Sequence, residues 1–312
     1  MIDSVADPKT AIDAARSEYL DALLSNGVIT DTGVPGVYGK SRDFERVLGG
    51  FDRFVTESGV DQNAEVLRFP PVINRADFER SGYLKSFPHL TGTIHGFRGN
   101  EREHAQMLRM LESGEEWTGH FHSTDLILTP AACYPVYPLA SGTLPKSGRL
   151  FDVQSYCFRY EPSNDPARMQ VFRMHEYVRI GTPDNVRRFR DVWLERSEAM
   201  LRSVGLDAKA VVANDPFFGR GGTILAASQM EQALKFEMVV PISTPEALTA
   251  VVSCNYHQDH FGKAFGIATA DGNVAHTACV GFGLERITLA LFMAHGFTPS
   301  SWPTAVRTTL GL

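Results

Sequence analysis

Cysteine is scarce in this sequence. The 312 residues contain only four cysteines, and none of them forms a C-x-x-C pair; they are Cys133, Cys157, Cys254 and Cys279. A small secreted protein held by disulfides carries more cysteines at closer spacing, so this pattern fits the reducing cytosol. We therefore predict a cytoplasmic protein that relies on a hydrophobic core, and the chain is long enough to build one.

Long apolar runs are absent as well. The N-terminal sequence MIDSVADPKTAIDA is acidic and has no apolar stretch, so we expect no secretory signal. The longest uncharged stretch, between Asp125 and Lys146, contains four prolines. A membrane-spanning helix does not carry proline so densely, and we expect no membrane segment.

The sequence also lacks an excess of positive charge. Lysine and arginine total 30 against 36 aspartates and glutamates, which gives a formal net charge of −6. Proteins that grip a polyanion without specificity are usually basic. Nucleic acid is therefore not the expected partner on charge alone.

Amphipathic spacing predicts several helices. The clearest covers 42–58, where apolar residues recur at i, i+3, i+4 and i+7. Asn100 and Glu103 form a predicted capping box at the start of a helix over 101–112. Other predicted helices cover 11–24, a short segment capped by Asn74, a segment from Pro130 to Leu139 with Thr129 as N-cap, and 183–203 behind Thr182. The residues between the helices 11–24 and 42–58 read as a loop rich in glycine and valine.

Strand patterns occur between these helices. The predicted strands cover 64–69, 125–128, 151–161, 170–180, 208–213, 234–241, 248–256 and 274–281. Two of them, 151–161 and 170–180, follow each other directly. That order favours an α+β fold, with an antiparallel or mixed sheet flanked by helices, over a doubly wound parallel sheet.

The richest chemistry lies in the segment CFRYEPSNDPARMQVFRMHE, residues 157–176. As a hairpin, its two-residue period places Arg159 and Glu161 on one surface with Phe172 and Glu176. A solvent-facing sheet with ion pairs is one explanation. The other is a nucleotide platform, since an arginine fork matches phosphate oxygens and an aromatic ring can stack on a base.

A second informative segment lies near the C-terminus. A strand of small residues leads into Gly281-Phe282-Gly283-Leu284-Glu285-Arg286 and then into the apolar sequence ITLALFMAHG. Glycines allow a ligand to approach the backbone, and Arg286 in the first helical turn offers a fixed cation. A G-x-G pattern alone is also explained by an ordinary strand-to-helix turn.

Together the two segments resemble motifs 2 and 3 of class II aminoacyl-tRNA synthetases, and EVLRFPPVI at 65–73 resembles their motif 1. Within that class the sequence is most similar to seryl-tRNA synthetases, through the segments 70–88, 129–145 and 253–261. The resemblance covers about residues 60–300. It implies a class II synthetase-like antiparallel sheet flanked by helices, with a short helical N-terminal region at 1–60 and a catalytic domain at 61–312.

The N-terminal region departs from the seryl enzymes. Those enzymes begin with a long basic coiled coil that holds tRNA, whereas residues 1–60 here carry six basic and ten acidic residues. A catalytic core without that arm resembles the amino acid:[carrier protein] ligases. These ATP-dependent, AMP-forming enzymes make an aminoacyl-adenylate and pass the aminoacyl group to the phosphopantetheine thiol of a small carrier protein. The resemblance therefore makes tRNA an unlikely partner. Two alternatives stay open, a minimal seryl-tRNA synthetase and an inactive paralogue that acts as a binding module.

The resemblance also implies roles for individual residues. Arg159 would bind the α-phosphate of ATP and the amino-acid carboxylate, while Glu161 and Phe172 would hold the adenine. Arg168 and Arg286 would bind the γ-phosphate, so Arg159 and Arg286 are the expected catalytic pair. The remaining expected contacts are Glu237 with Mg²⁺ and ATP, and Lys235, Asn255 and Glu176 with the amino acid.

A zinc site is implied in the same way. Cys133, Glu176 and Cys279 match its three protein ligands, which leaves a fourth position for the substrate amine. The family implies a small amino acid, glycine or alanine, rather than serine. It also implies a homodimer through the motif 1 strand. For the carrier protein we expect recognition by 183–203 and by the loop near 217–222.

Overall fold

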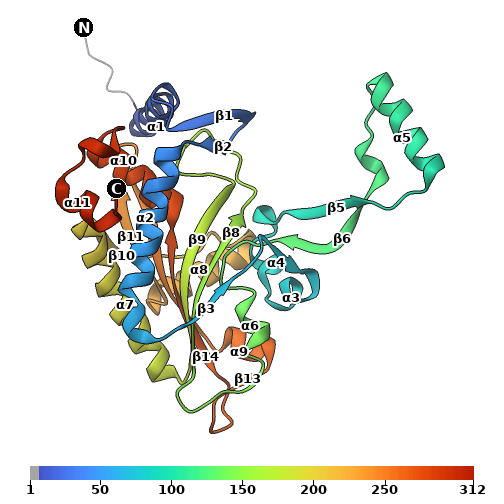
Figure 1. The fold of residues 1–312 in the computed structure, drawn as a ribbon. Coiled ribbons are helices and arrows are strands. Elements are labelled where there is room, and N and C mark those ends of the chain that lie inside the picture. Colours follow the sequence, from blue (N-terminus) through green and yellow to red (C-terminus); the bar gives the residue numbers. More distant parts are fainter. Residues whose placement is uncertain (1–6) are drawn as a thin grey trace.

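The computed structural model describes residues 7–312, and a seven-stranded sheet forms its centre (Figure 1). The first six residues of the acidic N-terminal segment lie outside the described residues. The strand order is β10-β11-β12-β14-β9-β8-β3. The strands are β3 (Glu65–Arg68), β8 (Arg149–Phe158), β9 (Val171–Gly181), β10 (Lys209–Val212), β11 (Lys235–Pro241), β12 (Leu248–Gln258) and β14 (His276–Gly283). All neighbours pair antiparallel except β3, which runs parallel to β8, so the predicted α+β class is confirmed.

Five helices cover one face of this sheet. They are α1 (Pro8–Ser25), α2 (Arg42–Ser58), α7 (Pro183–Ser203), α10 (Leu284–His295) and α11 (Thr304–Leu310). Their apolar stripes and one face of the sheet form a single core that includes Phe44, Phe51, Trp193 and Phe282, all fully buried. Burial of each such side chain is worth about 1.5–3 kcal/mol. This core makes the sheet a rigid support for whatever lies on its other face.

The opposite face carries smaller elements. Helices α6 (Val136–Leu139) and α9 (His260–Phe265) pack there with the short parallel pair β7 (Gly142–Thr143) and β13 (Ile267–Ala268). Beside them lies a three-stranded sheet of β4 (Val72–Asn74), β6 (Phe121–Leu128) and β5 (Thr93–Phe97), with α3 (Arg75–Arg80) and α4 (Tyr83–Ser86). Helix α5 (Glu101–Ser113) stands away from the body at the end of this sheet (Figure 1). The remaining elements are the hairpin β1 (Ile29–Val34) and β2 (Val37–Lys40), helix α8 (Gly219–Glu231), and the 3₁₀ turns Val60–Gln62, Pro88–Leu90, Thr118–His120 and Pro299–Ser301.

Most predicted helices are confirmed, with boundaries set by their caps. Helix α2 has the predicted bounds, and Ser41 accepts a hydrogen bond from the Phe44 N–H. The capping box of α5 is present, because Asn100 and Glu103 each accept from the other's backbone. Helix α7 begins at Pro183 as predicted, although the Thr182 side chain makes no capping bond.

Two local predictions were wrong. The segment from Pro130 to Leu139 forms turns, and only Val136–Leu139 is helical, because Pro135 lacks the N–H that a helix interior requires. The Thr129 hydroxyl therefore caps no helix, and it is buried without a partner among the described residues. The region after α1, predicted as a loop, forms the hairpin β1–β2. Among residues 7–312, no helix is both long and apolar enough to cross a membrane.

Candidate active site

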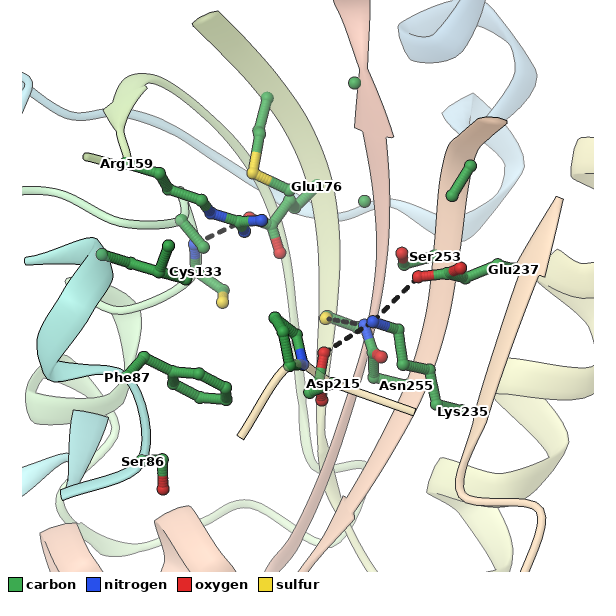
Figure 2. Close-up of a pocket in the computed structure, with 18 of the residues that line it drawn as sticks. Ser86, Phe87, Cys133, Arg159, Glu176, Asp215, Lys235, Glu237, Ser253 and Asn255 are labelled. Atoms are coloured by element: carbon green, nitrogen blue, oxygen red, sulfur yellow. Dashed lines mark hydrogen bonds and ion pairs between the residues drawn. The ribbon is translucent and has the colours of Figure 1, made fainter. Parts of the chain in front are cut away.

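A cavity of about 590 Å³ opens over the second face of the sheet (Figure 2). A volume of this size is typical of sites for small ligands. Nearly all the residues singled out in the sequence line it: Cys133, Arg159, Glu161, Phe172, Glu176, Lys235, Glu237, Asn255, Cys279 and Arg286. Arg168 is not part of the lining. It is half exposed, and its Nη1 lies 3.3 Å from Oε1 of Glu161.

Strand register explains why these side chains meet. On β9, Phe172, Met174 and Glu176 alternate onto one face, as predicted. Glu176 lies opposite Gly281 of β14, where an added Cβ would approach the Glu176 side chain to 3.3 Å. Glycine at this position leaves room for the carboxylate. Strand β8 ends at Phe158, so the predicted strand 151–161 was too long, and Arg159 sits on the loop that follows.

Two thiols and a carboxylate form a buried cluster at the floor of the cavity. The ligand atoms of Cys133, Glu176 and Cys279 all lie within 4.8 Å of one another. The three residues come from the turns before α6, from β9 and from β14. The Cys133 N–H donates to Oε1 of Glu176 at 3.2 Å. This separation allows one ion to contact all three groups, and two sulfurs with one carboxylate are a donor set that suits zinc.

Burial changes the acid–base properties of this cluster. It raises the pKa of Glu176 to about 8, and the nearby Cys279 adds to the rise. The hydrogen bond with Cys133 lowers the pKa of Cys279 although burial opposes it, and the same bond raises the pKa of Cys133. The Tyr137 hydroxyl is buried beside Cys133 and has no hydrogen-bond partner among the described residues. The Tyr137 hydroxyl next to the cluster can therefore form a hydrogen bond with a bound ligand.

Cationic side chains gather at another side of the cavity. Arg159 Nε donates to the Pro130 carbonyl at 3.2 Å, and its guanidinium lies 5.4 Å from the ring centre of Phe172. Arg286 donates to the Ala167 and Ala250 carbonyls at 2.8 and 3.0 Å. Burial lowers the pKa of Arg286 to about 10, and the positive charge of Arg159 adds to this effect. Two cations this close, one of which lowers the pKa of the other, favour an anionic ligand between them.

Lys235 forms the centre of a third group. It is buried, and its Nζ lies 2.5 Å from Oδ1 of Asp215 and 2.9 Å from Oε1 of Glu237. Glu237 on β11 lies directly opposite Ser253 on β12, and their oxygens face the same part of the cavity (Figure 2). A carboxylate beside a hydroxyl matches the oxygen ligands that Mg²⁺ prefers.

The lining residues that sequence reasoning did not single out include Phe87, Asp215, Ser253 and His257. Ser253 and His257 alternate with Asn255 in the sequence SCNYHQDHF, so strand periodicity offered a signal for them. Phe87 and Asp215 lie outside the predicted strands, on segments that tertiary structure brings to the cavity. No local pattern distinguishes them.

Comparisons with known proteins agree with this geometry. The chain is 47% identical over 93% of its length to "Amino acid--[acyl-carrier-protein] ligase 1" of Bradyrhizobium diazoefficiens, and it covers 89% of that protein. It is 30% identical to the type-2 serine–tRNA ligase of Methanopyrus kandleri, but over only 57% of the chain and 36% of that protein. No protein-family model matches the chain.

The fold is that of class II synthetase cores. The crystal structure of M. kandleri SerRS in complex with A. aeolicus tRNASec superposes with a TM-score of 0.80 and 22% identity. The superposition covers 94% of this chain but 60% of the synthetase. The predicted class II fold is confirmed, and the ligase-like relative matches far more of the sequence than the tRNA ligase does.

Proposed function

Because this chain belongs to the family of amino acid–acyl-carrier-protein ligases, we propose that it activates glycine or alanine with ATP and transfers the aminoacyl group to the phosphopantetheine thiol of a carrier protein. Activation of an amino acid and its transfer to a carrier are the family's activity. One structural observation supports the proposed reaction with ATP and an amino acid. A half-buried cationic pair, Arg159 and Arg286, and the cluster Cys133, Glu176 and Cys279 line the same cavity.

In the first step, a carboxylate oxygen of the amino acid attacks the α-phosphorus of ATP, and the bond to pyrophosphate breaks. Arg159 would bind both the carboxylate and the α-phosphate, and Arg286 and Arg168 would bind the γ-phosphate. Glu161 and Phe172 would hold the adenine. Positioning and charge neutralisation supply most of the rate in such a transfer. The half-buried position of Arg159 in the cavity wall supports this role, because its charge is only partly screened by water.

Cys133, Glu176 and Cys279 would hold a zinc ion, and Glu237 with Ser253 would hold Mg²⁺. The donor types and the short separations within the cysteine–glutamate cluster support the zinc assignment. When bound, zinc offers an open position for the amino group of the substrate. The cluster itself orients the amino acid, with its carboxylate directed toward Arg159.

Polar side chains lie next to the cluster. Asn255 Nδ2 donates to Sγ of Cys279 at 3.4 Å, and Lys235 and Asp215 lie next to it (Figure 2). An amino acid held at the cluster would direct its side chain toward these polar groups. Lys235 and Asn255 are thus proposed substrate contacts, and the choice of glycine or alanine rests on the family resemblance.

In the second step, the carrier's pantetheine sulfur attacks the carbonyl carbon, and the bond from that carbon to the AMP phosphate oxygen breaks. We place carrier docking at α8 and the loop before it. Phe218, Ile224 and Leu225 are exposed there, and Leu225 also lines the cavity. Helix α7, the other expected surface, buries its apolar stripe in the core.

The protein is also proposed to be a homodimer that does not bind tRNA. Strand β3, the motif 1 strand, lies at the edge of the sheet, and 60% of Val66 is exposed. Residues 1–60 carry a net charge of −4. This negative charge supports a region that does not bind tRNA, because a polyanion is held by basic residues.

The test is pyrophosphate exchange with glycine, alanine, serine and leucine, followed by thioester formation on a carrier with and without its phosphopantetheine. We expect exchange with glycine or alanine, and thioester only on the modified carrier. Absence of exchange with every amino acid would refute the proposed function. Efficient charging of tRNA would favour the synthetase alternative instead.

A further inference from the structure

We infer that His257 is a positioning residue for Cys279, and that a hydrogen bond from its ring to the Cys279 sulfur determines how tightly the cluster binds zinc. The inference rests on the zinc site proposed above. It concerns a residue outside the three ligands. His257 lies on β12, across from the strand that carries Cys279.

The contacts place the ring between two groups of β14. Nε2 of His257 lies 3.6 Å from Sγ of Cys279, and Nδ1 lies 3.0 Å from Oγ1 of Thr277. Thr277 is fully buried. A metal-bound thiolate can only accept hydrogen bonds, so Nε2 must carry the proton. Nδ1 is then the acceptor, and the Thr277 hydroxyl donates to it. One hydroxyl thus fixes both the tautomer and the orientation of the ring.

The backbone is distorted where His257 is placed. Tyr256 pairs with Ala278 and Gln258 pairs with Thr277, so His257 is an extra residue in a β-bulge. Gln258 has φ of 54°, a left-handed conformation that favours glycine. Such a conformation is unfavourable for a residue other than glycine and persists when the surroundings require it. Bulges of this kind redirect side chains next to active sites, and here the redirected side chain is His257.

Aromatic rings hold the imidazole from the sides. Tyr137 and Phe261 are stacked at 3.8 Å between ring centres. The His257 ring stands edge-on to both, at 6.4 Å from Tyr137 and 5.0 Å from Phe261. These contacts limit the rotation of the ring. The N–H direction toward Cys279 is therefore set before any ligand binds.

The two sulfurs of the cluster have different partners. Cys279 has two side-chain donors, Asn255 at 3.4 Å and His257 at 3.6 Å. The Cys133 sulfur shares a hydrogen bond with Cys279, and the Cys133 backbone N–H donates to Glu176. Donors outside the ligand shell orient a ligand and typically change metal affinity 10–100-fold when removed. We therefore assign to His257 the fixing of the Cys279 thiolate.

Four variants test this inference. His257→Ala removes the donor, His257→Gln keeps an N–H, and Thr277→Val removes the group that fixes the ring. The matched control is His276→Gln, because His276 lies on β14 but contacts Tyr256 and does not line the cavity. Zinc affinity is measured by competition with a chromophoric chelator, and the cobalt-loaded proteins are compared by their sulfur-to-cobalt charge-transfer band. Circular dichroism reports folding.

We expect His257→Ala to weaken zinc binding about 10–100-fold and to shift the charge-transfer band. His257→Gln is expected to retain most of the zinc affinity. The affinity of Thr277→Val is expected to lie between those of His257→Ala and the wild type, and the control is expected to match the wild type. Wild-type affinity in both His257→Ala and Thr277→Val overturns the inference. Equal losses in His257→Ala and His257→Gln also overturn it, because the affinity would then not depend on an N–H donor at this position.

Two further outcomes separate this inference from the proposed function. If His257→Ala does not fold, the inference is tested by comparing the zinc affinities of His257→Gln and Thr277→Val with that of the wild type. A wild-type protein that binds no zinc overturns both the zinc site and this inference, whereas amino-acid-dependent pyrophosphate exchange in the same preparation would leave the proposed reaction standing.

Discussion

The Lys235 ammonium lies 2.5 Å from the Asp215 carboxylate, and the two residues come from different segments over the cavity. Lys235 belongs to β11, whereas Asp215 lies on the loop between β10 and α8. Asp215 also binds α8, since its N–H donates to Oε1 of Gln229 at 2.7 Å and Nε2 of Gln229 donates back to its carboxylate at 2.8 Å. One carboxylate therefore joins the loop and α8 to the central sheet.

Replacing this carboxylate is expected to loosen the covering segment. In Asp215→Asn, Lys235 loses one of its two anionic partners, and hydrogen bonds to charged groups contribute about 1.5–3 kcal/mol. We expect KM for the amino acid to rise about tenfold or more, and amide exchange across 213–231 to quicken. The control Asp207→Asn, at an exposed position before β10, is expected to change neither quantity. Unchanged KM and exchange in Asp215→Asn would contradict the prediction.

Arg159 provides a test of the proposed activation step. Arg159→Lys keeps the charge but loses the planar fork that can contact a carboxylate and a phosphate together. We expect pyrophosphate exchange to fall about 10²–10³-fold, the loss typical of a missing donor to developing charge. Arg202→Lys, at the exposed end of α7, is the control. A change of less than threefold in Arg159→Lys would remove Arg159 from the activation step.

The sequence allowed accurate prediction where structure is determined locally. The bounds of α2 and the capping box of α5 follow from spacing and from side chains within one turn. The helix predicted from Pro130 was wrong because a single residue, Pro135, outweighs the cap signal before it. Helix α8 was missed, since its sequence begins GRGGT and glycine disfavours helices.

The site was predictable only in part for a similar reason. Glu176 and Phe172 could be placed on one face because strand alternation is local. Asp215 reaches the cavity along a loop whose path depends on its contacts with β11 and α8. His257 points at Cys279 because of a bulge that only the pairing of β12 with β14 reveals. The path of this loop and the position of the bulge depend on tertiary structure, and the sequence alone does not show them.

Cysteine replacement separates the proposed zinc ligands from the structural cysteines. We expect about one zinc per chain in the wild type and almost none in Cys133→Ser, because two remaining ligands bind zinc weakly. Amino-acid-dependent exchange is expected to disappear with the metal and to return when zinc is added to chelator-treated wild type. Cys254→Ala is the control, since Cys254 lies in the main core and does not line the cavity. Full zinc content in Cys133→Ser, measured by elemental analysis, would refute the ligand set.

Acid stability tests the contact between α2 and β9. Arg173 donates to both oxygens of Glu45 at 2.7 and 2.8 Å. These bonds lower the pKa of Glu45 below 4.5, although burial opposes them. A lowered pKa in the folded state stabilises the fold above the unfolded pKa, and this stabilisation is lost as the pH falls through the folded pKa.

Glu45→Gln is therefore expected to lower the free energy of unfolding at pH 7 by about 1 kcal/mol or less, because Glu45 is 43% exposed. The difference from wild type is expected to shrink as the pH falls below 4.5. Urea denaturation at a series of pH values measures it. A difference that stays constant, or grows toward acid pH, would contradict the assigned pKa direction.

The open edge of β3 tests the proposed dimer. Its backbone pairs with β8 on one side only, and Val66 exposes 60% of its surface. Lysine on an edge strand opposes pairing with another chain, so Val66→Lys is expected to convert a dimer of 34.4 kDa chains into a monomer by light scattering at micromolar concentration. Val211→Lys on β10, the opposite edge of the same sheet, is the control. A monomeric wild type, or equal dissociation of both variants, would show that β3 is not the interface.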